Sequence, residues 1–170
     1  MEGCLRDESR LVGAADSLSF PVDEPEVREL LARFSAAATP VTVQGARTGI
    51  AGGAVPLGGH VMSLSRMNRI LGLREEGGES ILAVQPGVLL QDLDVFAATR
   101  GLFLPPDPTE RSASLGGMSA TNASGARSYR YGPMRRHVRS VRVVLSDGST
   151  LALRRGQAAG SGGVRACGLS

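Results

Sequence analysis

Residues 41–56 combine a short β-branched run with a loop that contains Gly45, Gly49, Gly52 and Gly53. Glycine adopts positive φ angles at little steric cost, and successive backbone amides in such a loop can form a concave nest of partial positive charge. A nest of this kind binds anions, and its natural ligand is a diphosphate. A mobile linker can have the same composition, so the loop alone does not decide between a phosphate site and a linker.

The spacing of these glycines excludes the two commonest phosphate loops. The intervals do not give G-x-G-x-x-G, and a Walker loop needs a lysine after its second glycine. All 19 basic residues of this chain are arginines. Lysine Schiff-base chemistry is therefore excluded, and every cation is a permanent one that suits anion pairing better than proton transfer.

A second, proline-containing segment holds the other groups that could contact a ligand. The prolines of residues 105–108 exclude a regular helix or strand and fix an extended loop. A short helix is expected from about Ser114, with its free N–H groups and positive dipole end directed at an anion. Taken singly, these pieces also have structural explanations: a rigid connector at the prolines, a tight start of the helix at Gly116 and Gly117, and a turn cap at Asn122.

In this order, the two segments resemble the FAD-binding domain of FAD-linked oxidases of the p-cresol methylhydroxylase and vanillyl-alcohol oxidase type (PCMH type). In that family a strand leads into R/Q-G-x-x-T-G-x-x-G-G-x-x-P, which residues 44–56 match. The family then shows P-P-D-P, S-x-G-G-x-x-A-x-N-A-x-G and Y-G, which residues 105–108, 114–125 and 131–132 match. Two separated segments that agree with one family are far more specific than either segment alone.

The resemblance implies an α+β fold of two small α/β subdomains with FAD between them. The PCMH-type domain would span residues 21–155, with subdomains of about 21–75 and 76–155. An N-terminal segment, residues 1–20, would precede it. A loosely ordered tail rich in Gly, Ala and Ser, residues 156–170, would follow it.

The resemblance also implies which residues contact the cofactor. The backbone of the first loop would surround the FAD pyrophosphate, with Gly45, Ala46, Arg47, Thr48, Gly49, Gly52 and Gly53. The second segment would close over the pyrophosphate and the ribityl chain, with Gly116, Gly117, Thr121, Asn122 and Gly125. Asp107 and Ser114 lie in the part of the second segment that passes near the flavin ring in the family.

Two positions of the first loop bear on how the cofactor is held. Arg47 replaces a small residue, usually glycine, and its side chain is expected either to stay exposed in solvent or to pair with a phosphate. Thr48 stands where relatives that tether the flavin through this loop carry a histidine, and threonine cannot form that ring-nitrogen bond. FAD is therefore expected to be held non-covalently.

The resemblance is strongest to the D-lactate and glycolate dehydrogenase branch of the family. It implies an FAD-dependent oxidoreductase that oxidises a 2-hydroxy acid by hydride transfer to the flavin. In the family the substrate base and the carboxylate-binding groups lie in a separate cap domain, which this sequence lacks, so no catalytic residue is assigned. We expect the chain to be truncated, or to act with a partner subunit that supplies the cap. The alternative is a non-catalytic flavin- or nucleotide-binding module.

Bulk composition limits the other classes of function. With 170 residues and 42% hydrophobic content, the chain can bury one core, or two small subdomains that share one. No apolar run approaches the roughly 20 residues of a membrane helix, and the first residues lack the apolar segment of a signal peptide. We therefore expect no transmembrane segment and a cytoplasmic location. Arginines gather at residues 127–142, but the neighbouring motifs resemble a flavin family and aromatics make up only 4% of the chain, so we expect no nucleic-acid partner.

Cysteine and histidine are too sparse for other site chemistries. Cys4 and Cys167 lie near opposite ends of the chain, which argues against a disulfide framework. Too few Cys, His and paired carboxylates converge for a metal site. His60 and His137 are expected to be ordinary strand or surface residues and not catalytic bases.

Hydrophobic periodicity predicts the elements that must position the two segments. A helix is expected after Asp23, a candidate N-cap, because apolar residues recur there at i, i+3, i+4 and i+7. A second helix is expected over residues 89–97, and a single helical turn over residues 67–71. Strands are expected at residues 41–43, 60–64, 80–85, 138–145 and 150–153, the last two joined by a hairpin turn at Asp147 and Gly148.

Overall fold

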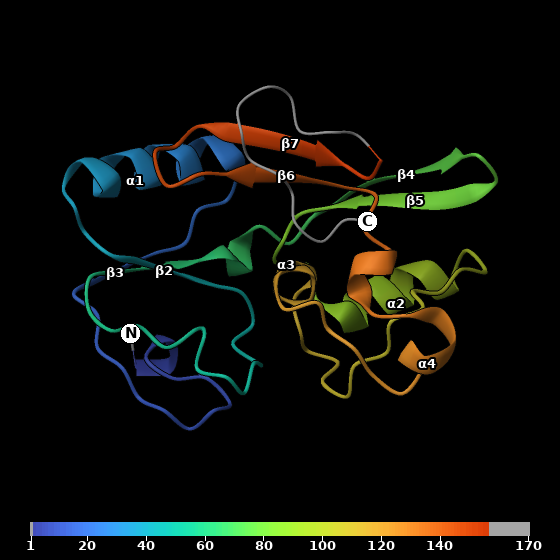
Figure 1. The fold of residues 1–170 in the computed structure, drawn as a ribbon, viewed down its shortest axis with the longest axis horizontal. Helices are drawn as coiled ribbons and strands as arrows, with labels where there is room; N and C mark the ends of the chain where they lie inside the picture. The colour runs from blue at the N-terminus through green and yellow to red at the C-terminus, as the bar shows by residue number, and fades with distance from the viewer. Residues whose placement is uncertain (1, 157–170) are drawn as a thin grey trace.

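The structure is a computed structural model that describes residues 2–156. The expected tail at residues 156–170, apart from Gly156, lies outside the described residues, as does Cys167. Figure 1 shows a sheet and α1 on one side of the molecule, α2, α3 and α4 on the other, and two hairpins along one edge. Among the described helices, none has the length and apolar character needed to cross a bilayer.

A three-stranded parallel sheet forms the first half of the molecule. Its strands are β1 (Ser17–Ser19), β2 (Val41–Gln44) and β3 (His60–Ser63), with β3 in the centre and parallel to both neighbours. All four residues of β3 are buried. The carboxyl ends of β2 and β3 point the same way, so the segment that leaves β2 begins at one edge of the sheet.

Helix α1 (Glu24–Ala36) connects β1 to β2, as the apolar periodicity predicted. Asp23 is its N-cap, and its side chain accepts a hydrogen bond of 3.0 Å from the backbone N–H of Glu26. The helix buries Val27, which packs with Met62 of β3 and with Met67. The helix is therefore fixed to the sheet through one apolar stripe.

Two antiparallel hairpins complete the strands. The first joins β4 (Ile70–Glu76) to β5 (Glu79–Val84) through a turn whose two glycines both have positive φ. The helical turn expected at residues 67–71 is wrong, because β4 begins at Ile70 and pairs with β5. The expected subdomain boundary at residues 75 and 76 falls inside β4.

The second hairpin joins β6 (Ser140–Val144) to β7 (Thr150–Arg154), and it confirms the predicted turn at Asp147 and Gly148. Gly148 has a φ of 81°, which a hairpin turn of this kind requires.

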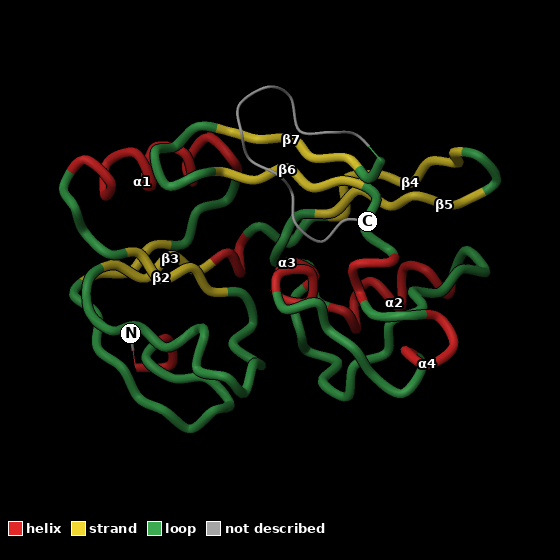
Figure 2. The backbone as a smooth tube through the Cα atoms, viewed as in Figure 1, coloured by secondary structure: helices red, strands yellow, loops and turns green. Residues whose placement is uncertain are grey.

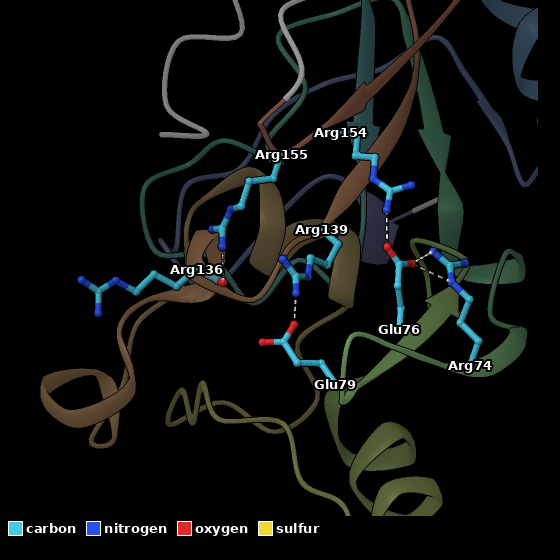
Figure 3. A network of polar contacts seen from close by, with 7 residues as sticks. All are labelled: Arg74, Glu76, Glu79, Arg136, Arg139, Arg154 and Arg155. Carbon is cyan, nitrogen blue, oxygen red and sulfur yellow. Dashed lines mark hydrogen bonds and ion pairs between the residues drawn. The ribbon is translucent and has the colours of Figure 1, made fainter.

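Ion pairs connect the two hairpins, as Figure 3 shows. Glu76 at the end of β4 pairs with Arg74 and with Arg154 at the end of β7. Glu79 at the start of β5 pairs with Arg139, just before β6. These side chains are well exposed, and exposed pairs contribute only about 0.2–1 kcal/mol each. The network therefore links the two hairpins but adds little to the stability of the fold.

Short helices and the second core form the other half. They are α2 (Leu90–Ala98), α3 (Leu115–Ala120), α4 (Ser128–Tyr131) and the 3₁₀ helix Met134–Arg136. The core beneath them is built from Val88, Leu90, Leu93, Ala113, Leu115, Met118 and Met134. Residues from β4 and β5 pack against this core. The start of α3 is thus held against the segment that follows β5.

Candidate cofactor-binding site

The glycine loop, residues 45–59, leaves the carboxyl end of β2 and returns to β3. Figure 2 shows it among the loops below the parallel sheet, beside the N-terminal segment. In the part of the chain that the structure describes, the backbone amides of residues 47–53 donate no hydrogen bond. The amides on either side do: Ala46 donates to Ser114 Oγ at 3.3 Å and Ala54 to Asp7 Oδ2 at 3.4 Å. A continuous row of backbone donors is thus available to an anion or to water.

Two residues of the glycine loop have left-handed backbone conformations. Gly52 has a φ of 74° and Arg47 a φ of 60°. Alternation of left-handed and other conformations turns successive amides toward one side, which is the geometry of an anion nest. The conformation is strained at Arg47, because a side chain disfavours it by about 1–2 kcal/mol. Within the described residues Arg47 forms no ion pair, so neither of its two expected roles is decided.

Ser114 joins the glycine loop to the second segment. Its side chain is 2% exposed, and its Oγ accepts hydrogen bonds from Ala46 N and from Gly117 N, both at 3.3 Å. A Cβ on Gly45 would lie 2.2 Å from the same Oγ. Gly45 is therefore a glycine because the two segments meet there. The structure brings Gly45, Ala46, Ser114 and Gly117 together, as a shared site requires.

The start of α3 differs from the expectation of free N–H groups. Leu115 N donates to Val88 O at 2.8 Å, Gly116 N to Pro86 O at 2.8 Å, and Gly117 N to Ser114 Oγ. The expectation was wrong because the chain after β5 runs beside this turn and supplies acceptors to its amides. No amide of this first turn is left for a ligand.

Two glycines of the second segment are explained by packing. A Cβ on Gly116 would lie 2.6 Å from Pro86 Cβ, and a Cβ on Gly125 would lie 1.8 Å from Asp107 O. Both distances are far below van der Waals contact. For Gly116 this supports the structural explanation, a tight start of the helix. Contact of either glycine with a cofactor stays a prediction.

Three further predicted site residues are engaged within the protein. Asp107 forms ion pairs with Arg111 at 2.8 Å and Arg127 at 3.3 Å. Asn122 Oδ1 accepts a hydrogen bond from the backbone N–H of Arg135 at 3.0 Å, as a turn cap does. Thr121 Oγ1 donates to Gly117 O at 2.9 Å. The remaining predicted residues, Thr48, Gly49 and Gly53, make no side-chain contact that would engage them: Thr48 is half-buried, and no atom lies within 4 Å of where a Cβ would stand on Gly49 or Gly53.

A cavity of about 150 Å³ lies where the two segments meet. Its lining comprises Gly45, Ala46, Ser65, Asn68, Gly87, Leu89, Asp92 and Ser114. Complete ligand pockets measure roughly 300–1,000 Å³, so this cavity can enclose part of a dinucleotide and not the whole. Sequence reasoning missed five of these residues: Ser65, Asn68, Gly87, Leu89 and Asp92. The signal that could have found Gly87 is the Pro86-Gly87 pair directly after the strand expected at residues 80–85. A Cβ on Gly87 would lie 2.2 Å from Leu64 O.

Neither histidine lines the cavity. His60 is 2% exposed, is hydrogen-bonded to the hydroxyls of Ser17 and Ser19 at 2.7 and 2.8 Å, and stacks on Phe34. Burial, with a smaller effect from Arg33, lowers the pKa of His60, so the ring is held neutral in the sheet. His137 Nε2 lies 3.1 Å from Tyr131 O. In residues 2–156 no group of three or more His, Cys, Asp or Glu side chains could hold a metal ion.

Comparison with known proteins gives a consistent match. The sequence profile of the FAD binding domain family matches residues 15–154. D-lactate dehydrogenase of Anaerostipes hadrus is 43% identical over 155 residues, which is 89% of this chain and 32% of that protein. Glycolate oxidase subunit GlcD of Bacillus subtilis (strain 168) is 34% identical over 138 residues, which is 80% of this chain and 29% of that protein.

A solved structure with a similar fold is 6-hydroxy-D-nicotine oxidase from Arthrobacter nicotinovorans. Its TM-score is 0.76 at 17% sequence identity, over 89% of this chain and 32% of that chain. At that identity the likeness is one of fold alone. The chain spans about a third of the length of the relatives it matches.

Proposed function

This chain belongs to the FAD binding domain family of FAD-linked oxidoreductases, and from that membership we propose that it binds FAD non-covalently, with the glycine loop around the pyrophosphate. The observation that carries the proposal is the row of backbone amides at residues 47–53 that donate to no acceptor in the described chain. Backbone donors that remain unpaired are costly unless a ligand or water accepts from them. A diphosphate offers several acceptor oxygens and a charge of the right sign.

The residues around the cavity divide the work of holding the cofactor. The amides of residues 47–53 would bind the diphosphate, and Ser114 would hold the second segment against them. Thr48 offers no ring nitrogen for a covalent flavin bond, which supports a non-covalent mode. When bound, FAD supplies a ring that accepts a hydride, and the protein supplies orientation.

We propose that the complete enzyme oxidises a 2-hydroxy acid of the D-lactate or glycolate class. The support is the similarity to a D-lactate dehydrogenase and to a glycolate oxidase subunit, which extends along 32% and 29% of their lengths. A general base must reach the substrate hydroxyl within roughly 2.6–3.2 Å. The described chain places neither histidine at the cavity, so a further domain or a partner subunit would supply that base, and FAD would lie between the two halves.

A second candidate is a flavin- or nucleotide-binding module without catalysis of its own. The observation in its favour concerns the lining of the cavity. Of the described residues that line it, Asp92 is the one with a titratable side chain. A carboxylate beside a diphosphate repels it, and Asp92 would face a hydroxyl of the ligand.

Titration of the purified protein with FAD tests the main proposal, with quenching of flavin fluorescence as the measure of binding. Saturable quenching is expected, and acid precipitation should leave the yellow colour in the supernatant. Absence of saturable binding would refute the proposal. Anaerobic addition of D-lactate or glycolate then separates the two candidates: this chain alone should not bleach the flavin, whereas bleaching at an enzymatic rate would show that it holds the base itself.

A further inference from the structure

The N-terminal residues 2–14 run along the glycine loop, and we call them the strap. They precede the part of the chain that the family profile matches, which begins at residue 15. Figure 1 shows this segment in blue beside the loop between β2 and β3. Their sequence has little pattern, yet they contact the glycine loop at both ends of its row of unpaired amides.

The first contact passes through Gln44, the last residue of β2. Its side chain is fully buried, and Nε2 donates to Cys4 O at 2.7 Å and to Ala54 O at 2.6 Å. One amide group therefore ties the strap and the far end of the glycine loop to the edge of the sheet. Gln44 Oε1 accepts no hydrogen bond within the described residues. Burial of this unpaired oxygen costs free energy, and the two hydrogen bonds that Nε2 donates offset that cost.

The second contact brackets residues 47–53. Asp7 is 8% exposed, and its carboxylate accepts hydrogen bonds from Ser9 N at 2.9 Å and from Ala54 N at 3.4 Å. Glu8 N donates to Arg47 O at 3.3 Å. The strap therefore holds the strained residue at the start of the row and the residue just after its end. A strained conformation persists only where the surroundings fix it, and the bond from Glu8 does so.

The third contact is a close approach of backbones. A Cβ on Gly13 would lie 1.9 Å from Pro56 O. Next to it, Ala14 N donates to Pro56 O at 3.0 Å and Gly58 N to Ala14 O at 2.8 Å. The end of the strap thus pairs with the end of the glycine loop as a short piece of parallel strand would.

We infer that Asp7 and Gln44 are positioning residues for the cofactor: through them the strap holds residues 47–53 in the anion-binding conformation before the ligand arrives. Neither side chain needs to touch FAD. Binding to a preformed loop loses less conformational entropy than binding to a loop that must first become ordered. The strap therefore increases affinity by preorganisation. The inference rests on the proposed function for its ligand, and on the hydrogen bonds of the strap for its geometry.

The matched pair Asp7→Ala and Glu8→Ala tests this in the full chain. Both remove one carboxylate from neighbouring positions, but the Glu8 side chain makes no hydrogen bond or ion pair within the described residues. We expect Asp7→Ala to speed hydrogen exchange of the Val55 amide, which donates to Gly52 O at 3.0 Å, and to weaken FAD binding at least about tenfold. Glu8→Ala should change neither by more than about twofold.

A second pair addresses the buried amide. Gln44→Leu should act like Asp7→Ala, whereas Gln85→Leu, which also buries leucine in place of a glutamine, should leave exchange of the Val55 amide unchanged. Gln85 is 7% exposed, and its side chain accepts from Arg69 N at 3.0 Å, away from the strap. Equal exchange in wild type, Asp7→Ala and Gln44→Leu would overturn the inference, and a Gln44→Leu chain that does not fold leaves Asp7→Ala to decide.

Exchange is measured without FAD, so this arm does not depend on the cofactor. A wild-type protein that binds no FAD refutes the proposed function, and exchange alone then decides whether the strap orders the loop. If wild type binds FAD and both Asp7→Ala and Gln44→Leu bind it with the same affinity, the inference that the strap positions the loop is refuted. The proposed function is then unaffected.

Discussion

Between β2 and β3 the amides of residues 47–53 donate to no acceptor in the described chain, whereas at the start of α3 the amides of Leu115, Gly116 and Gly117 are all paired. Gly49 and Gly125 differ in the same way. A Cβ on Gly49 would meet no atom within 4 Å, whereas a Cβ on Gly125 would lie 1.8 Å from a carbonyl oxygen. One segment keeps its backbone accessible, and the other is closed by packing.

This difference assigns different work to two motifs that look alike in sequence. In the glycine loop, absence of side chains leaves amides accessible to a ligand. In the second segment, absence of side chains lets the helix start and the proline loop approach neighbouring backbone. A substitution at Gly49 should therefore affect cofactor affinity, and one at Gly125 should affect stability.

The largest effect is expected for Gly125→Val. Its side chain would overlap Asp107 O, and overpacking of this kind costs about 3 kcal/mol. For a chain of this size the melting temperature of the apo protein should fall by about 6–12 °C. Thermal unfolding followed by circular dichroism measures this. A variant with unchanged melting temperature and weakened FAD binding would show that Gly125 faces the ligand, and the comparison would fail there.

Gly49→Val is the converse case. Its φ is not in the left-handed region and its surroundings are open, so the free energy of unfolding should change by less than about 0.5 kcal/mol. A β-branched side chain beside the amides should nevertheless raise the dissociation constant for FAD at least about tenfold, or 1.4 kcal/mol. Fluorescence titration and urea unfolding of the same preparation test both statements. Unchanged affinity would argue that the glycine loop does not contact the cofactor.

Acid should weaken the half that carries the glycine loop. Because burial lowers the pKa of His60 in the folded state, the unfolded chain takes up a proton first as the pH falls below about 6.5. The free energy of unfolding should therefore be highest above that pH and decrease as the pH falls below it. Urea unfolding at pH 7.5, 6.5 and 5.5 measures the slope.

The His60→Leu variant should reduce that slope, at a cost of roughly 1 kcal/mol at pH 7.5 from the hydrogen bonds it loses. His137→Gln is the matched control, since it removes a histidine that lies outside the parallel sheet, and it should leave the slope from His60 in place. An undiminished slope in His60→Leu would show that another group causes it.

The smallest effect is expected for Arg47→Gly. Glycine removes the left-handed strain of about 1–2 kcal/mol, but it also gives the unfolded chain more freedom, so the net gain in stability should be about 0.5 kcal/mol. Urea unfolding detects a gain of this size. FAD affinity should stay within about threefold, and a loss beyond about tenfold would instead assign the guanidinium to a phosphate.

Local signals in the sequence predicted most helices and turns. The stripe from Val27 and the N-cap at Asp23 located α1, and Asp147 with Gly148 located the β6–β7 hairpin. The same approach failed for residues 67–71, because a short apolar run fits a helical turn and a strand equally well. Pairing with β5, a partner further along the chain, decided it.

The site shows the same limit. The sequence places Ser114 at a helix start, which α3 confirms. It cannot show that the carbonyl oxygens of Pro86 and Val88 accept hydrogen bonds from the amides of that turn. These two acceptors lie more than 20 residues before α3 in the chain. The strap went unnoticed for a related reason: its contacts with Gln44 and Ala54 are single hydrogen bonds between distant segments, and these leave no periodicity to read.

The most direct test of the central claim, that the glycine loop is a diphosphate site, is the ratio of the dissociation constants for FMN and FAD, measured in wild type and in Gly49→Val. FMN carries the same flavin without the diphosphate. We predict that wild type binds FAD at least about tenfold more tightly than FMN, and that the ratio falls toward one in the variant. Equal affinity of the wild-type protein for FMN and FAD would contradict the account.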